Sequence, residues 1–184
     1  MPGSGPPGQE PILLVPIYLG ARPRLIHHLE TRLEEVFKVR VEVLRPFFDP
    51  ELALDRERGQ YHSSHLLGQL ARAPGEGKVV GITGVDLFVP VLTWVYGEAQ
   101  MPGRSAVASI HRLRNEIYGL PADEERLFER AAKEAIHELG HTWGLVHCED
   151  PRCVMRSCTW IDEIDLKSSA FCHRCLATLR SARQ

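Results

Sequence analysis

The segment from His137 to His147 constrains the fold of this chain more than any other part of the sequence. It contains His137 and His141 four residues apart. On a helix this spacing places both imidazoles on one face, where they can hold two corners of a tetrahedral zinc ion. Gly144 can end the helix in a left-handed turn, and His147 then follows as a third ligand. Three ligands leave the fourth position for water, which is typical of a catalytic zinc site.

Glu138 directly follows the first of these histidines. A carboxylate at this place can reach a water molecule on the metal from one side, and it is therefore the candidate general base. Three His, one Glu and one Gly at fixed spacing occur by chance in roughly one chain in ten thousand of this composition. The alternative, ordinary surface or core histidines on a helix, is accordingly disfavoured.

The cysteines form one local cluster. All five lie between Cys148 and Cys175, and the first 147 residues contain none. An odd, local set indicates a metal site in a reducing compartment, and we expect a cytoplasmic protein with a second, structural zinc. Spacing does not select four of the five, because Cys148/Cys153 and Cys153/Cys158 are both separated by four residues. Cys172 and Cys175 alone could be a redox pair, but the strand-to-helix context of such a pair is missing.

Hydrophobic periodicity predicts an α+β chain. The expected strands are residues 12–17, 39–44, 78–83, 88–97 and 105–110, and the expected helices are residues 24–37, 61–73, 121–143 and 174–182. Residues 46–59 are expected to form a loop. We expect Pro121 to lie in the first turn of the third helix, and Gly144 to end it.

Length and charge limit the remaining possibilities. The 184 residues fit one domain over 12–184, with an N-terminal lobe over 12–144, a C-terminal lobe over 145–184 and a flexible lead-in over 1–11. The net charge of −2 argues against a nucleic-acid partner. No apolar run approaches the roughly 20 residues of a membrane span, and the first ten residues do not resemble a secretory signal.

The pattern His-Glu-x-x-His-x-x-Gly-x-x-His is the metzincin zinc signature. Cys148 follows the last histidine, and Cys153-Val-Met155 and Cys172-x-x-Cys175 complete a longer motif. Over residues 134–175 the chain therefore resembles the archaemetzincin family, and residues 58–61, 84–87 and 97–99 are similar less specifically.

The resemblance implies a metzincin-like fold: a twisted mixed sheet with backing helices, an active-site helix and a small zinc-stapled C-terminal lobe. It selects Cys148, Cys153, Cys172 and Cys175 as ligands of the structural zinc. Cys158 is then a spare thiol, and His173 is a minor rival ligand. The resemblance also places Met155 in a tight Met-turn beneath the catalytic zinc, without binding the metal.

The implied function is a zinc metallopeptidase that hydrolyses peptide bonds with a zinc-activated water and Glu138 as base. We expect two zinc ions per chain, a peptide or protein substrate, and a monomer. A cleft peptidase aligns its substrate by backbone pairing, and the candidate edge strand consists of Gly97, Glu98, Ala99, Gln100 and Met101. The alternative is a non-enzymatic or weakly active zinc protein that binds peptides on a peptidase scaffold.

Overall fold

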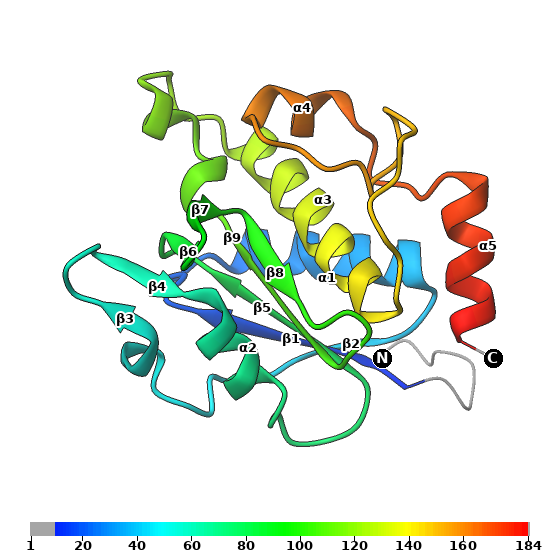
Figure 1. Ribbon diagram of the computed structural model, residues 1–184, viewed down its shortest axis with the longest axis horizontal. Helices are drawn as coiled ribbons and strands as arrows, with labels where there is room; N and C mark the ends of the chain where they lie inside the picture. The colour runs from blue at the N-terminus through cyan, green and yellow to red at the C-terminus, as the bar shows by residue number, and fades with distance from the viewer. Residues whose placement is uncertain (1–9, 184) are drawn as a thin grey trace.

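A five-stranded sheet forms the centre of the molecule in the computed structural model, which describes residues 10–183 (Figure 1). Its strand order is β2-β1-β5-β9-β8, and every pairing is parallel except that of β8 with β9. The strands are β1 (Ile12–Ile17), β2 (Val41–Val43), β5 (Lys78–Thr83), β8 (Gly97–Ala99) and β9 (Ser105–Ser109). The predicted lead-in over residues 1–11 lies outside the described residues except for its last two.

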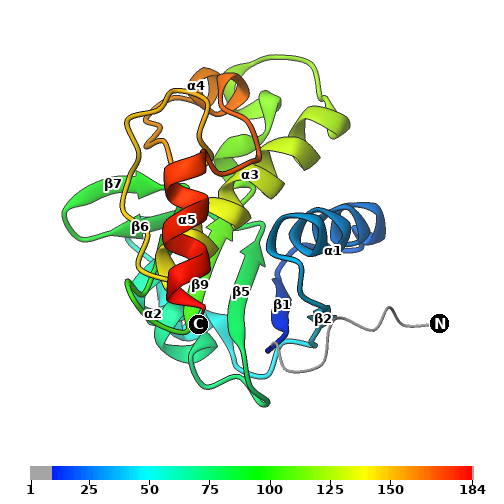
Figure 2. The ribbon, with the colours of Figure 1, turned by 90° about the vertical axis from the view of Figure 1, so that its right-hand side faces the viewer.

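Helices cover both faces of this sheet, which explains why its central strands are almost continuously apolar. In β1, Ile12 and Leu14 face a core built with α1 (Pro23–Phe37) and α3 (Glu124–Thr142). Leu13 and Val15 point to the opposite face, where they pack with α2 (Ser63–Leu70). The two helices expected to back the sheet, α1 and α2, therefore lie on opposite faces (Figure 2).

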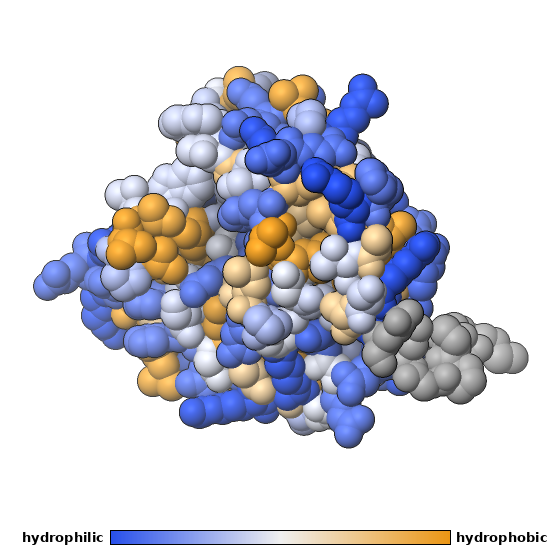
Figure 3. Space-filling model, turned by 45° about the vertical axis from the view of Figure 1, so that its right-hand side comes forward, coloured by the Kyte–Doolittle hydropathy of each residue, from blue (hydrophilic) through white to orange (hydrophobic). Residues whose placement is uncertain are grey.

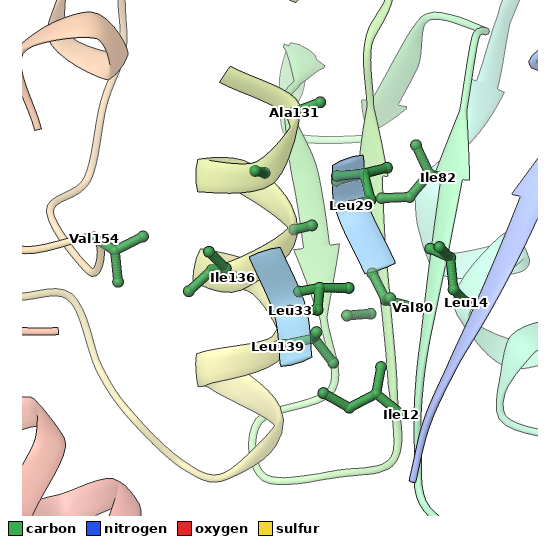
Figure 4. Packing of buried hydrophobic residues seen from close by; sticks show 14 of the residues in the cluster. Ile12, Leu14, Leu29, Leu33, Val80, Ile82, Ala131, Ile136, Leu139 and Val154 are labelled. Atoms are coloured by element: carbon green, nitrogen blue, oxygen red, sulfur yellow. The ribbon is translucent and has the colours of Figure 1, made fainter. Parts of the chain in front are cut away.

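The helix α3 is buried on more than one side. Figure 4 shows Ala131 and Leu139 on the side that faces the sheet and α1, while Ile136 points away from the sheet towards Val154. Both sides belong to one core cluster, because the chain after α3 folds back over the helix. This burial fixes the helix that carries His137.

The structure corrects the expected start of α3. Pro121 lies before the helix and not in its first turn, because Asp123 is the N-cap and its carboxylate accepts from the N–H of Arg126 at 2.9 Å. Glu124 follows in the first turn, where a negative charge favours the helix dipole. At the other end the helix stops at Thr142, and Gly144 has the left-handed φ of 84° that the sequence predicts.

A second, four-stranded sheet was not expected. It has the order β3-β4-β6-β7 and consists of β3 (Leu54–Asp55), β4 (Gln60–His62), β6 (Leu87–Val89) and β7 (Leu92–Val95). The predicted single strand over 88–97 is wrong, because the chain reverses after Pro90 and divides into β6, β7 and β8. Likewise, the predicted loop over 46–59 contains η1 (Pro50–Ala53) and β3, and residues 60–62 join β4 before α2 begins.

Residues after α3 form a long irregular segment with two helices, α4 (Ile161–Leu166) and α5 (His173–Ala182). The sequence predicted α5 but not α4. The guanidinium of Arg130 on α3 donates twice to the carboxylate of Asp165, and Lys133 donates to the carbonyl of Ile164 at 2.9 Å. These bonds hold α4 against α3. Two short 3₁₀ helices, η2 (His111–Leu113) and η3 (Asn115–Tyr118), connect β9 to α3.

Within residues 10–183, no helix has both the length and the apolar character to cross a bilayer. The face in Figure 3 is largely hydrophilic and carries separate apolar patches. The most exposed large apolar side chain among the described residues is Val91, between β6 and β7, with 87% of its area accessible.

Candidate active site

The fold brings the three predicted histidines together. His137 and His141 lie on consecutive turns of α3, and His147 follows the turn at Gly144. One ring nitrogen from each of the three lies within 4.8 Å of the others. His137 is buried, His141 is half-buried and His147 is exposed, so the group opens to solvent on one side.

Backbone carbonyls fix the orientation of two of these imidazoles. Nδ1 of His137 donates to the oxygen of Val154 at 2.9 Å, and Nδ1 of His141 donates to the oxygen of Leu145 at 2.6 Å. Carbonyl oxygens only accept, so each Nδ1 carries the proton and each Nε2 carries a lone pair. Burial lowers the pKa of both rings, that of His137 most strongly, which keeps them neutral.

The two lone pairs face each other, because the Nε2 atoms of His137 and His141 are 3.1 Å apart. Two Zn–N bonds of about 2.0–2.1 Å at a tetrahedral angle span about 3.3 Å. Converging lone pairs repel unless a cation lies between them. The donor set therefore fits zinc.

Glu138 lies beside this group and is buried. Burial raises the pKa of its carboxyl well above the ordinary value, and the nearby charge of Glu134 adds to the effect, while Lys167 opposes it. Among residues 10–183, no group forms a hydrogen bond or an ion pair with this carboxylate. It is thus a buried carboxylate with no protein partner.

Met155, the predicted Met-turn residue, packs against α3. It is fully buried, and a Cβ added at Gly140 would lie 2.5 Å from its sulfur. Gly140 lies between His137 and His141 on α3. The turn is closed by the N–H of Arg156, which donates to the carbonyl of Cys153 at 3.0 Å.

The predicted substrate strand lies at the edge of the main sheet. Gly97, Glu98 and Ala99 form β8, which pairs with β9 on one side and is the last strand of the sheet on the other. Gln100 and Met101 lie beyond it, where the chain turns towards β9, although the N–H of Gln100 still donates to Ser105. The carboxylate of Glu98 accepts from the hydroxyls of Ser63 and Ser64 at the start of α2.

Four cysteines form a second donor group. The sulfurs of Cys148, Cys153, Cys172 and Cys175 all lie within 4.8 Å of one another. Those of Cys148 and Cys172 are 3.7 Å apart, far longer than a disulfide but near the roughly 3.8 Å between thiolates on a tetrahedral zinc. Neither Cys158 nor His173 belongs to this group.

Burial and hydrogen bonds shift the pKa of three of these thiols in different directions. A hydrogen bond from the N–H of Cys175 lowers the pKa of Cys172 to about 7, although burial opposes this. Burial raises the pKa of the Cys153 and Cys175 thiols. A zinc ion bound by these four sulfurs would hold them as thiolates.

Sequence reasoning missed a buried ion pair near the histidines. The ammonium of Lys167 lies 2.9 Å from Oε1 of Glu134, and both side chains are almost completely inaccessible. Glu134 precedes Glu138 by one helical turn, so the sequence could have predicted that both lie on the same face of α3. Lys167 directly follows α4, a helix that the sequence did not predict. No sequence pattern indicated that Lys167 would pair with Glu134.

Lys78 was also missed. It begins β5, and its ammonium donates to the carbonyl oxygen of Thr142 at 2.9 Å and to that of Gly103 at 2.7 Å. The N–H of Gly103 donates to the same Thr142 oxygen at 3.1 Å. Lys78 thus ties the C-terminal end of α3 to the turn between β8 and β9.

Comparison with known proteins agrees with this geometry. The model of peptidase family M54 matches residues 38–181. The chain belongs to this family. It is similar to the archaemetzincin of Methanocaldococcus jannaschii, with 41% identity over 156 residues that cover 85% of this chain and 86% of that protein. It is also similar to the archaemetzincin of Methanopyrus kandleri, with 46% identity over 132 residues, 71% of this chain and 72% of that protein.

Solved structures support the same assignment. The crystal structure of the M. kandleri archaemetzincin matches with a TM-score of 0.84 and 39% identity, covering 96% of this chain and 97% of that one. The zinc-dependent peptidase of Methanocorpusculum labreanum matches with a TM-score of 0.81 and 29% identity, covering 91% and 99%. The family resemblance and the metzincin-like α+β fold are confirmed. The chain is a zinc metallopeptidase.

Proposed function

We propose that this metallopeptidase hydrolyses peptide bonds with Glu138 as the general base, and that His137, His141 and His147 hold the catalytic zinc. One observation carries the proposal: a buried carboxylate without a protein partner adjoins a group of neutral imidazoles whose lone pairs converge. A raised pKa makes Glu138 a stronger base once it is ionised. A carboxylate with only a structural role would instead be paired.

The zinc ion, Glu138 and β8 have different roles in the proposed reaction. Zinc, when bound, supplies Lewis acidity that polarises the scissile carbonyl and makes water more acidic. Glu138 accepts a proton from the attacking water and returns it to the nitrogen of the leaving amine, so the peptide bond breaks with no net proton change at the enzyme. The free edge of β8 holds the extended substrate by backbone hydrogen bonds.

The second part of the proposal is a structural zinc on Cys148, Cys153, Cys172 and Cys175, which gives two zinc ions per chain. Thiolate coordination of a segment with little regular structure supplies folding energy. Residues 12–184 then act as one catalytic domain, whose lobe over 145–184 depends on this metal. In this proposal Met155 supports the histidines from below without binding metal.

We further propose that the protein acts as a monomer in a reducing, cytoplasmic compartment. Both donor groups come entirely from one chain. All five cysteines are free thiols, and four of them must stay reduced to bind zinc.

Two substitutions test the mechanism. Glu138→Gln should keep both zinc ions while kcat falls by about 10²–10⁴-fold, the usual contribution of general-base catalysis. His141→Ala should lose the more labile zinc. Glu129→Gln is the matched control, because Glu129 is an exposed glutamate on the same helix, and it should leave activity unchanged. Full activity in Glu138→Gln would refute the assigned base, and a wild-type protein with both zinc ions but no cleavage of any peptide would support the non-enzymatic alternative.

A further inference from the structure

A surface hollow lies apart from the three histidines and the four cysteines described above. It has a volume of about 770 Å³, within the range of small-molecule sites. We call it the arginine pocket; it is lined by Arg58, Gly59, Gln60, Tyr61, Gly84, Val85, Asp86, Thr93, Trp94, His111 and Arg112. It contains parts of two segments, 58–61 and 84–87, that have no role in the proposed reaction.

The pocket lies where ligand sites commonly occur in open α/β sheets. Gly84 follows the last residue of β5, and His111 comes two residues after the end of β9. These strands are parallel neighbours, so their carboxyl ends meet at one edge of the sheet. Ligands of such sheets bind outside the carboxyl ends of the strands.

Both carboxylate oxygens of Asp86 accept hydrogen bonds from other side chains of the protein. The guanidinium of Arg112 donates to its two oxygens at 2.7 and 2.6 Å, and the amide of Gln60 donates at 2.8 Å. Burial would raise the pKa of Asp86, but these hydrogen bonds outweigh it and lower the pKa, so the group is ionised at neutral pH. The carboxylate fixes the plane of Arg112 and is not free to bind a cation.

The guanidinium groups of Arg58 and Arg112 have N–H donors that no group within residues 10–183 accepts. Nη1 of Arg112 donates to no group within residues 10–183, and the guanidinium carbon of Arg112 lies over the ring of Trp94, 4.9 Å from the centroid. Arg58 lies over the ring of Phe88 at 4.4 Å and pairs with no carboxylate in the described part of the chain. Burial lowers the pKa of His111, which stays neutral. The charged lining is thus two arginines and one carboxylate.

A purely structural role explains only part of this arrangement. Gln60 donates to Asp86 and to the carbonyl of Thr93, so the network joins the second sheet to the end of the main sheet. That role accounts for Gln60, Asp86 and the bidentate face of Arg112. Packing on Phe88 accounts for the position of Arg58, but no structural contact within residues 10–183 uses the guanidinium N–H donors of Arg58 or Nη1 of Arg112.

We propose that the arginine pocket binds a small anion, whose carboxylate or phosphate oxygens accept hydrogen bonds from Arg58 and Arg112. Guanidinium groups bind planar carboxylate and phosphate oxygens through paired N–H donors, and such charge-assisted bonds are strong. Asp86 holds one of the two arginines ready for the ligand.

Calorimetric titration of the zinc-loaded chain tests this site. The probes are succinate, inorganic phosphate and, as a neutral control, succinamide. Arg58→Gln should weaken binding at least about tenfold, the loss expected for one charge-assisted hydrogen bond. Arg56→Gln is the matched control, because it removes the same charge from the same turn but does not line the pocket. Tighter binding of succinate or of phosphate identifies which anion the site prefers.

Three outcomes would overturn the proposal. The first is no binding of either anion at millimolar concentration. The second is equal weakening in Arg58→Gln and Arg56→Gln, which would indicate general electrostatic attraction. The third is succinamide binding as tightly as succinate. Zinc content and thermal unfolding of both variants establish that each is folded.

Discussion

Gly97 and Glu138 are in direct contact between the edge strand and the active-site helix. A Cβ added at Gly97 would lie 2.7 Å from Oε1 of Glu138 and 2.6 Å from the backbone oxygen of Val107. Real Cβ atoms do not approach so closely, so only glycine fits here. The strand proposed to hold the substrate and the proposed base are therefore in contact with no side chain between them.

Gly97→Ala should displace Glu138, because the backbone oxygen of Val107 cannot move as easily as the carboxylate. Misplacing a catalytic group by about 1 Å can cost about 10²-fold, and we expect kcat/KM to fall by about 10–100-fold with zinc content unchanged. Gly68→Ala is the control, because nothing lies within 4 Å of its Cβ position. That change should leave activity intact and stabilise α2 by roughly 0.5–1 kcal/mol. Unchanged activity in Gly97→Ala would contradict the contact.

Lys78→Met should loosen the β8–β9 turn against α3, because the carbonyls of Thr142 and Gly103 lose their shared ammonium donor. We expect a stability loss of about 1–3 kcal/mol and a rise in KM that exceeds the change in kcat. Lys78→Arg keeps the charge and the donors and should restore most of KM. The measurement is steady-state kinetics with one peptide. A fall in kcat alone, with KM unchanged, would argue against a role in aligning the substrate strand.

Local patterns predicted that the three histidines come together, because they are close in sequence. His137, Glu138 and His141 share one helix, and Gly144 returns the chain so that His147 joins them. Helical spacing and a glycine turn describe this geometry without any tertiary information. The ligand set itself stays a prediction until metal binding is measured.

Features that depend on long-range contacts were not predictable. The run 88–97 alternates like one strand, but its residues divide among two sheets because β6 pairs with β4 and β8 pairs with β9. The pair Glu134–Lys167 joins residues 33 apart through the fold of the C-terminal segment. Periodicity describes single elements, and it contains no information on which partners they choose.

Glu134→Gln should move the acid limb of the pH profile to lower pH. Glu138 must be ionised to act as base, so activity is lost as pH falls through its pKa, which burial and then the charge of Glu134 raise. Removing that charge lowers the pKa of Glu138, and the acid limb of the pH profile therefore moves to lower pH. The measurement is kcat/KM from pH 4.5 to 8, with Glu129→Gln as the control on the exposed face.

Breaking a buried ion pair costs about 3–5 kcal/mol, so Glu134→Gln can fail to fold. The double variant Glu134→Gln, Lys167→Met removes both charges and avoids an unpaired ammonium. Its acid limb should also move to lower pH, because Glu134 affects Glu138 more than Lys167 does. A limb that stays in place in both variants would show that Glu134 does not act on the base.

Cys172→Ser and Cys158→Ser should separate the proposed ligands from the spare thiol. Cys172 lies within the sulfur group, so its loss should release the structural zinc, and because Cys148 adjoins His147 it should weaken the catalytic zinc as well. Cys158 lies outside the group and contacts the carbonyl of Arg156, so its replacement should cost about 0.5–3 kcal/mol and keep both metals. Elemental analysis and melting curves, taken side by side, give the comparison. Loss of zinc from Cys158→Ser but not from Cys172→Ser would mean that the ligand set is wrong.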